Sequence, residues 1–322
     1  MLKKGLKEYP FDKYGYPEIR VIDDTDFACE GDDPFATAQL LLTSKFDVKA
    51  ITAANYLHQL DSVENSYNKI LEMLDVMGIR DEVTVLRGSL PMRSETDYDR
   101  SEASDFIVEE AMKDDPRPLF VCVQGAITNV AVALLTEPAI ANRMHVIWIG
   151  GAPYPAGGNE FNLSNDVVAA RVVMNSEVGL WQVTAKAYSM MRVSFAELYE
   201  KVYPCGKLGK WLCEQLWDVN ERYGKMRNSI PDFRASLAEP TAYAHFACGE
   251  MWSLGDNPVA GLMLNSQKHD AVITGAPYIN DDSTYTLRPD NPRKIAVYDT
   301  VDAHFILNDL FAKLRYQYGD EA

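Results

Sequence analysis

The chain has 322 residues, 47% of them hydrophobic, and its 47 acidic and 31 basic side chains give a formal net charge of −16. This length can bury a core of its own, and it allows one large α/β domain or two smaller ones. The negative charge argues against nucleic-acid polymers and anionic membrane surfaces as partners, because both would repel the chain. An acidic balance also suits a protein that gathers carboxylates around a cation, although solubility alone is the simpler explanation.

Targeting and cysteine patterns point to a cytoplasmic protein. The basic residues near the N-terminus have no apolar stretch behind them, so we expect no secretory signal. No run of 18 apolar residues occurs, so we expect no transmembrane helix. The 5 cysteines are odd in number and include no C-x-x-C pair, which favours a reducing compartment.

Apolar runs of strand length alternate with helical patterns along the chain. We expect strands at 19–22, 48–51, 83–86, 119–123 and 146–149, because these runs are short and rich in β-branched residues. We expect helices between them at 34–42, 68–77, after Ser101 and at 130–135, and mainly helices beyond about residue 190. The alternation predicts an α/β fold with a mostly parallel central sheet flanked by helices and a helical C-terminal part. Because no linker interrupts the pattern, we expect residues 1–322 to form a single domain.

The segment from Asp23 to Asp33 holds six acidic residues in eleven positions. It begins where a buried strand is expected to end and stops where a helix begins, which is where open α/β sheets bind ligands. Crowded carboxylates repel one another, and a hard divalent cation with oxygen ligands would offset that repulsion. The plainer alternative is a solvated loop with Asp33 as the helix N-cap, but a cap needs only one carboxylate.

This segment resembles the N-terminal signature of the inosine-uridine nucleoside hydrolases, Asp-x-Asp-Pro-Gly-x-Asp-Asp followed by a helix. Each further match is weak alone, but several in register with the expected strands are specific. In chain order they are Asn55 after the second strand, Asn68 at the start of a helix, Gly-Ala-Ile-Thr-Asn at 125–129, Ile-Gly-Gly-Ala at 149–152, Glu-Phe-Asn at 160–162 with Asp166 behind it, and Asp-Asn-Pro at 256–258.

The resemblance implies a Ca²⁺-dependent hydrolase of the N-glycosidic bond of ribonucleosides or related ribosides. The side chains of Asp26, Asp33 and Asp256 and the backbone carbonyl of Thr128 would hold the ion. Asp26 would also be the general base that activates water, and the transition state would resemble an oxocarbenium ion. Asp24 would orient the loop from behind. The residues that would bind the sugar are Asp32, Asn55, Asn159, Glu160 and Asn162.

Two loops differ in length from the family pattern. Five residues separate Asp26 from Asp32, where the family has three, so Glu30 could approach the ion. Asn159 runs directly into Glu160, which alters one contact to the sugar.

A third departure concerns the leaving group. Gly255 precedes Asp256 at the position where purine-cleaving members carry a histidine proposed to protonate the base. The general acid is therefore open. His245 and Trp252 are candidate contacts to a base, with His245 eleven residues before Asp256 on what reads as one helix. Ordinary packing is the commoner role for such residues. Further candidates are His58, Tyr223 and Phe27.

Two alternatives to a nucleoside hydrolase stay open. Without the histidine, the chain could be a metal-dependent protein that binds a sugar or nucleoside without turnover. Altered loops around a preserved metal site also suit a hydrolase of a non-nucleoside riboside. In each case the partner is a small-molecule riboside, and the resemblance implies a homo-oligomer.

Overall fold

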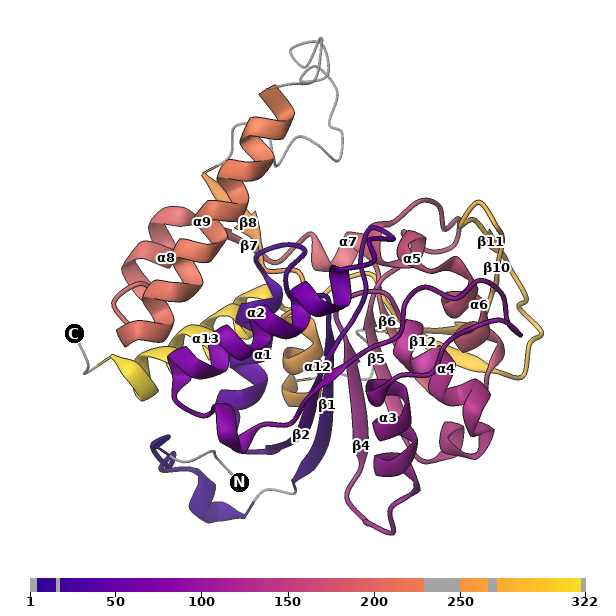
Figure 1. The fold of residues 1–322 in the computed structure, drawn as a ribbon, viewed down its shortest axis with the longest axis horizontal. Helices are drawn as coiled ribbons and strands as arrows, with labels where there is room; N and C mark the ends of the chain where they lie inside the picture. The colour runs from indigo at the N-terminus through magenta and orange to yellow at the C-terminus, as the bar shows by residue number, and fades with distance from the viewer. Residues whose placement is uncertain (1–4, 16–17, 229–249, 266–270, 320–322) are drawn as a thin grey trace.

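The computed structural model describes residues 5–15, 18–228, 250–265 and 271–319. Neighbouring strands of the central sheet are parallel except at one edge, where the last strand runs antiparallel. This confirms the predicted fold class. In spatial order the sheet consists of β3 (Val85–Arg87), β2 (Phe46–Ala53), β1 (Ile19–Thr25), β4 (Leu119–Val123), β5 (His145–Ile149), β6 (Gly179–Val183), β12 (Lys294–Tyr298) and β9 (Val272–Gly275) (Figure 1).

Helices cover both faces of the sheet (Figure 1). One face carries α1 (Asp33–Leu42), α2 (Ser62–Met77), α12 (Pro258–Asn265) and α13 (Ala303–Tyr318), and the other carries α3 (Glu102–Met112), α4 (Thr128–Thr136) and α6 (Val167–Asn175). The remaining α-helices are α5 (Phe161–Asn165), α7 (Ala185–Tyr188), α8 (Phe195–Lys201) and α9 (Gly206–Asn228), and the remaining strands are β7 (Arg192–Ser194), β8 (Met251–Ser253), β10 (Tyr278–Ile279) and β11 (Tyr285–Thr286).

The central strands are buried on both faces, as parallel strands between two helical layers must be. In β4, Cys122 belongs to one hydrophobic core while Val121 and Val123 belong to the other. Val21 and Ile22 divide between the two cores in the same way in β1. Side chains alternate across a strand, so each strand connects the two cores.

Some element boundaries differ from those expected. β1 continues to Thr25, so Asp23 and Asp24 lie within the strand and not after it. α2 begins at Ser62, which places Asn68 inside the helix. The N-cap of α1 is Asp32, and Asp33 is its first residue.

The expected helix from His245 to Asp256 is wrong in its described part. β8 occupies Met251–Ser253 and pairs with β7, so no single helix reaches Asp256. His245 itself lies outside the described residues. Among the described residues, none of the helices combines the length and the apolar character needed to span a bilayer.

Candidate functional site

Four carboxylates of the predicted site converge at the carboxyl end of β1. Side-chain oxygens of Asp32, Asp33 and Asp256 all lie within 4.8 Å of one another, and the three residues are buried. Asp26 is not in this group of three, but its carboxyl group lies within hydrogen-bonding reach of Asp33. The loop after β1, the start of α1 and the turn before α12 therefore bring these side chains into one place.

The buried carboxylates of this cluster repel one another, and a positive charge would offset that repulsion. Burial raises the pKa values of Asp26, Asp32 and Asp256 well above the usual range, and the neighbouring acidic groups raise them further. Within the described part of the chain, no basic side chain forms an ion pair with any of these carboxylates. Carboxylate oxygens are the ligands of hard divalent cations, so the donor set fits such an ion.

Hydrogen bonds and one close approach of the backbone fix the orientation of the carboxylates. The Thr25 hydroxyl donates a hydrogen bond of 2.5 Å to Asp33 Oδ1, and the Gly255 N–H donates one of 2.9 Å to Asp32 Oδ2. Gly125 permits the backbone after β4 to approach Asp26, because a Cβ placed there would lie 2.7 Å from Asp26 Cγ.

A buried polar network lies behind the cluster. Thr128 is the first residue of α4, and its hydroxyl accepts from Asn55 Nδ2 at 3.0 Å and donates to Asp166 Oδ2 at 2.8 Å. Asp24 Oδ1 accepts from Asn129 Nδ2 at 2.7 Å, while burial raises the pKa of Asp24 to about 6. Asn55 Oδ1 and Asp24 Oδ2 are buried acceptors without a partner among the described residues. Unpaired buried oxygens cost stability and often mark a ligand or ion position.

Two of the predicted sugar contacts are rigidly held. The Glu160 carboxylate accepts from the Gly151 N–H at 2.6 Å and from the Tyr188 hydroxyl at 2.9 Å. Asn162 Nδ2 donates to the carbonyls of Gln124 and Ile149, at 2.8 and 2.9 Å, where β4 and β5 end. Asn159 is exposed, and its Oδ1 accepts from the Ser164 hydroxyl.

The long loop before α1 is attached to α9. Gln215 Nε2 donates to the Gly31 carbonyl at 2.8 Å, and the Tyr223 hydroxyl donates to Glu30 Oε1 at 3.1 Å. Glu30 is half-buried, and its charge acts on Asp26, Asp32 and Asp256. The structure thus places Glu30 beside the cluster, as its sequence position suggested.

The aromatic candidates for a base contact lie mostly in the core. Trp252 is 2% exposed and Phe27 1%, so packing explains both side chains. The Tyr223 ring centroid lies 5.8 Å from that of Trp252, and Tyr223 is half-buried. His58 is exposed and has a φ of 52°. Tyr223 is therefore the ring that reaches the site, through its bond to Glu30.

The family model for inosine-uridine preferring nucleoside hydrolases matches residues 21–305. The chain belongs to this family. It is also 31% identical over 163 residues to the inosine-uridine preferring nucleoside hydrolase of Leishmania major, a match that covers 49% of this chain and 50% of that protein. The chain thus spans about half the length of this curated relative in the alignment. The predicted family is confirmed, and this family is metal-dependent.

Solved structures of nucleoside hydrolases share the fold. A plant nucleoside hydrolase superimposes with a TM-score of 0.70 at 18% identity, covering 92% of this chain and 99% of that one. A purine-preferring ribonucleoside hydrolase from Gardnerella vaginalis does so with a TM-score of 0.67 at 19% identity, covering 94% and 99%. These neighbours show the fold, and the family match supports the expected enzyme class, an N-glycosyl hydrolase.

The structure also shows site residues to which the sequence assigned no role. Asp166 accepts from the Thr128 hydroxyl and from the Met92 N–H, so it supports the residue predicted to hold the ion. The sequence could have pointed to Asp166, since this residue occurs in a family motif. Tyr188 and Gln124, which hold Glu160 and Asn162, had none, because their roles depend on contacts between distant segments.

Proposed function

We propose that this nucleoside hydrolase cleaves the N-glycosidic bond of a ribonucleoside or related riboside and depends on Ca²⁺. The observation that supports this most is the convergence of Asp26, Asp32, Asp33 and Asp256 without a basic partner among the described residues. Carboxylates in this arrangement stabilise positive charge, and hydrolysis of a glycosidic bond develops positive charge on the sugar.

We assign the ion to Asp26, Asp33, Asp256 and the backbone carbonyl of Thr128. When bound, Ca²⁺ supplies positive charge that offsets these carboxylates and holds sugar hydroxyls. The hydrogen bond that the Thr25 hydroxyl donates to Asp33 Oδ1 orients the remaining lone pairs of this carboxylate. Thr128 is oriented by the hydrogen bonds of its hydroxyl to Asn55 and Asp166.

The chain's own residues would carry the reaction. Asp26 takes a proton from the attacking water as the general base. Asp32 and the fixed side chains of Glu160 and Asn162 hold the sugar, and Asn55 Oδ1 offers an acceptor to its edge. Because these groups are already held by the protein, little reorganisation accompanies the development of charge on the sugar.

Release of ribose tests this function directly. The purified protein would be incubated with Ca²⁺ and a panel of purine and pyrimidine ribonucleosides, and free ribose would be measured. We expect release from at least one riboside, loss of that activity with chelator and its recovery when Ca²⁺ is returned. No release from any riboside in the presence of Ca²⁺ would contradict the proposal.

Gly255 favours a second candidate, a protein that binds a riboside without turnover. A Cβ at this position would lie 3.3 Å from both Asp32 Oδ2 and Tyr188 Cδ2, so the family's histidine would crowd both side chains. Calorimetry separates the candidates, since binding of ribose or a nucleoside without any ribose release would favour this second one.

The broader expectations remain proposals as well. We propose that residues 1–322 form one domain, since the two hydrophobic cores share one sheet. We also propose a cytoplasmic homo-oligomer whose partner is a small riboside, and neither a nucleic-acid polymer nor a membrane. The formal charge of −16 supports the last point.

A further inference from the structure

The turn that carries Asp256 is hydrogen-bonded to α1 on both sides of this residue. On the N-terminal side, the Gly255 N–H donates to Asp32 Oδ2 at 2.9 Å. On the C-terminal side, Asn257 Nδ2 donates to Gln39 Oε1 at 2.8 Å, and both of these side chains are buried. Asp32 is the N-cap of α1 and Gln39 lies inside this helix. The turn is therefore attached to the same element that supplies the other carboxylates of the group of three.

The side-chain amide of Gln39 has one orientation. Its Nε2 donates to Asp309 Oδ2 at 2.8 Å and to the Ile306 carbonyl at 3.1 Å, both on α13. A carboxylate and a carbonyl oxygen accept hydrogen bonds, so the NH₂ group of Gln39 faces α13 and its oxygen faces Asn257. The bond to Asn257 is therefore determined by contacts on the far side of Gln39.

Gln39 belongs to a closed ring of hydrogen bonds between α1 and α13. Lys313 Nζ donates to Asp309 Oδ2 at 2.6 Å and to Thr43 Oγ1 at 2.7 Å. The Thr43 hydroxyl donates to the Gln39 carbonyl at 2.6 Å, and Lys313 and Thr43 are both buried. Bonded polar networks in a protein interior make their members rigid. Gln39 is thus a fixed point from which Asn257 is held.

We propose that Gln39 and Asn257 are positioning residues for the cation, an inference that rests on the assignment of the ion to Asp256 in the proposed function. Apolar packing between α1 and α12 is non-directional, whereas this hydrogen bond sets where the turn lies along α1. It keeps the Asp256 carboxylate among those of Asp32 and Asp33, whose oxygens all lie within 4.8 Å of one another. Without the bond, the ion itself would have to draw the turn into place, and its affinity would fall.

The Gln39→Met variant tests the inference by calorimetric titration of the full chain with Ca²⁺ alone. Methionine keeps the length of the side chain and removes its hydrogen bonds. We expect the Kd for Ca²⁺ to rise about 10–100-fold, as is usual when a residue that orients a metal ligand is lost.

Gln317→Met is the matched control. Gln317 is buried on α13 and exchanges hydrogen bonds of 2.7 and 2.8 Å with the backbone of Lys7, so its loss should lower stability and leave the affinity for Ca²⁺ as in the parent. A Kd unchanged by Gln39→Met, or raised equally by both variants, would overturn the inference and leave the proposed function intact. A parent that does not bind Ca²⁺ would contradict both, whereas one that binds Ca²⁺ as predicted but releases no ribose would contradict only the proposed hydrolysis.

Asn257→Ala removes the same hydrogen bond from its other end. We expect a similar rise in Kd, and we expect the double variant with Gln39→Met to bind Ca²⁺ about as weakly as the weaker single variant, because the bond is already lost. Effects that multiply in the double variant would overturn the shared role of the two residues. If Gln39→Met does not fold, Asn257→Ala carries the test, and an unchanged Kd would again overturn the inference.

Discussion

The buried acidic side chains of β1 are the part of the site that the sequence described least well. Aspartate is rare in strands, so the strand was expected to end at residue 22. Asp23 instead accepts hydrogen bonds from Thr37 and Gln124, and Asp24 from Thr52 and Asn129. These partners come from other strands and helices, and a single sequence does not show which segments will meet. The cluster from Asp26 to Asp33 was predictable, because its members are local in the chain.

Asp26→Asn tests the general base. We expect kcat to fall by a factor of about 10²–10⁴, because the amide cannot accept a proton from water. The shape of the side chain is kept, and its buried charge is removed, so the melting temperature should stay the same or rise. Steady-state ribose release and a thermal melt measure the two effects. A variant with unchanged kcat would exclude Asp26 as the base.

Asp33→Ala tests the ion site itself. Asp33 is within hydrogen-bonding reach of both Asp26 and Asp256, so its loss should abolish Ca²⁺ binding. Calorimetric titration with Ca²⁺ measures this. The control is Asp75→Ala, which removes a carboxylate paired with Arg80 on the surface and should bind Ca²⁺ like the parent. Equal affinities in both variants would place the ion elsewhere.

Among the elements, α9 positions the loop that distinguishes this chain from its family. The helical spacing of α9 was readable from the sequence, but its contact with the loop was not. Gly31 lies so close to α9 that a Cβ there would be 2.6 Å from Leu216 Cδ1 and 3.2 Å from Leu216 Cα. The absence of a side chain at Gly31 therefore sets how near Glu30 can come to Tyr223.

Gly31→Ala should destabilise the protein by about 1–3 kcal/mol, because the added methyl group overpacks the contact with α9. Gly224→Ala on the same helix is the control. A Cβ at Gly224 meets none of the described residues within 4 Å, so that change should be neutral or stabilise by up to about 1 kcal/mol through helix propensity. Denaturant unfolding measures both. Equal effects of the two substitutions would mean that the loop does not pack on α9 as described.

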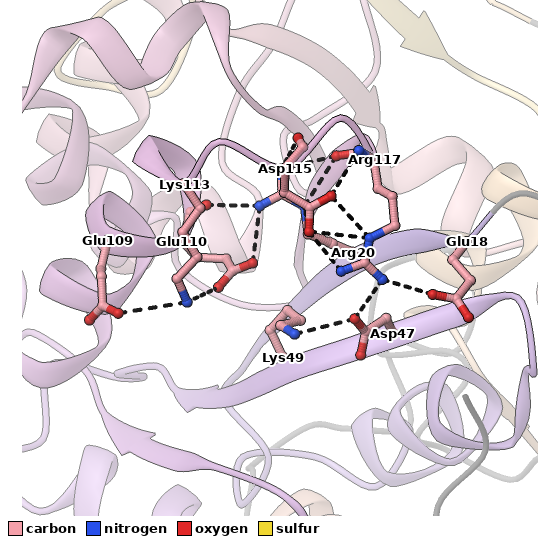
Figure 2. A network of polar contacts seen from close by, with 9 residues as sticks. All are labelled: Glu18, Arg20, Asp47, Lys49, Glu109, Glu110, Lys113, Asp115 and Arg117. Carbon is pink, nitrogen blue, oxygen red and sulfur yellow. Dashed lines mark hydrogen bonds and ion pairs between the residues drawn. The ribbon is translucent and has the colours of Figure 1, made fainter.

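An ionic network connects α3 to the start of β1, at the end of the sheet opposite the site (Figure 2). Arg20 Nη1 lies 3.0 Å from Glu110 Oε1 and also donates to the Glu110 carbonyl at 2.9 Å, with both side chains buried. Arg117 extends the network to Glu18, Asp47 and Asp115 (Figure 2).

Glu110→Ala should destabilise the protein by about 1.5–3 kcal/mol, because it removes a charged hydrogen bond from the buried Arg20 and leaves Asp115, 3.7 Å from Arg20 Nε, as its carboxylate partner. Glu109→Ala is the control one position earlier. Glu109 is exposed and 3.6 Å from Lys113, so its loss should cost about 0–1 kcal/mol. Denaturant unfolding distinguishes the two. A destabilisation below about 1 kcal/mol for Glu110→Ala would show that Asp115 compensates the charge of Arg20 without Glu110.

At the scale of the whole molecule, the fold places its charges unevenly. The end of the sheet at which its parallel strands begin carries carboxylates that are paired with arginine and lysine (Figure 2). At the opposite end, where the strands finish, the site carboxylates Asp26 and Asp256 form no ion pair with a basic residue among those described. The class of fold followed from the alternation of strands and helices, since each element buries an apolar face in a predictable way. The pairing of charges did not follow, because it depends on which distant segments meet.

This distribution gives the Ca²⁺-free protein a characteristic pH dependence. Burial raises the pKa of Asp23 from 3.8 to about 7 and that of Asp24 from 3.8 to about 6. Between about pH 4 and about pH 7 the folded protein therefore holds protons that the unfolded chain has released, and stability falls as pH rises. Bound Ca²⁺ stabilises the folded state and favours the ionised form of the neighbouring carboxylates, so this fall should shrink or vanish. Thermal melts at about pH 5 and about pH 7, each with chelator and with Ca²⁺, measure the effect. A chelated protein whose melting temperature rises over that interval would contradict the role of Asp23 and Asp24. A protein whose melting temperature does not respond to Ca²⁺ at about pH 7 would contradict the assignment of a cation to Asp26, Asp33 and Asp256.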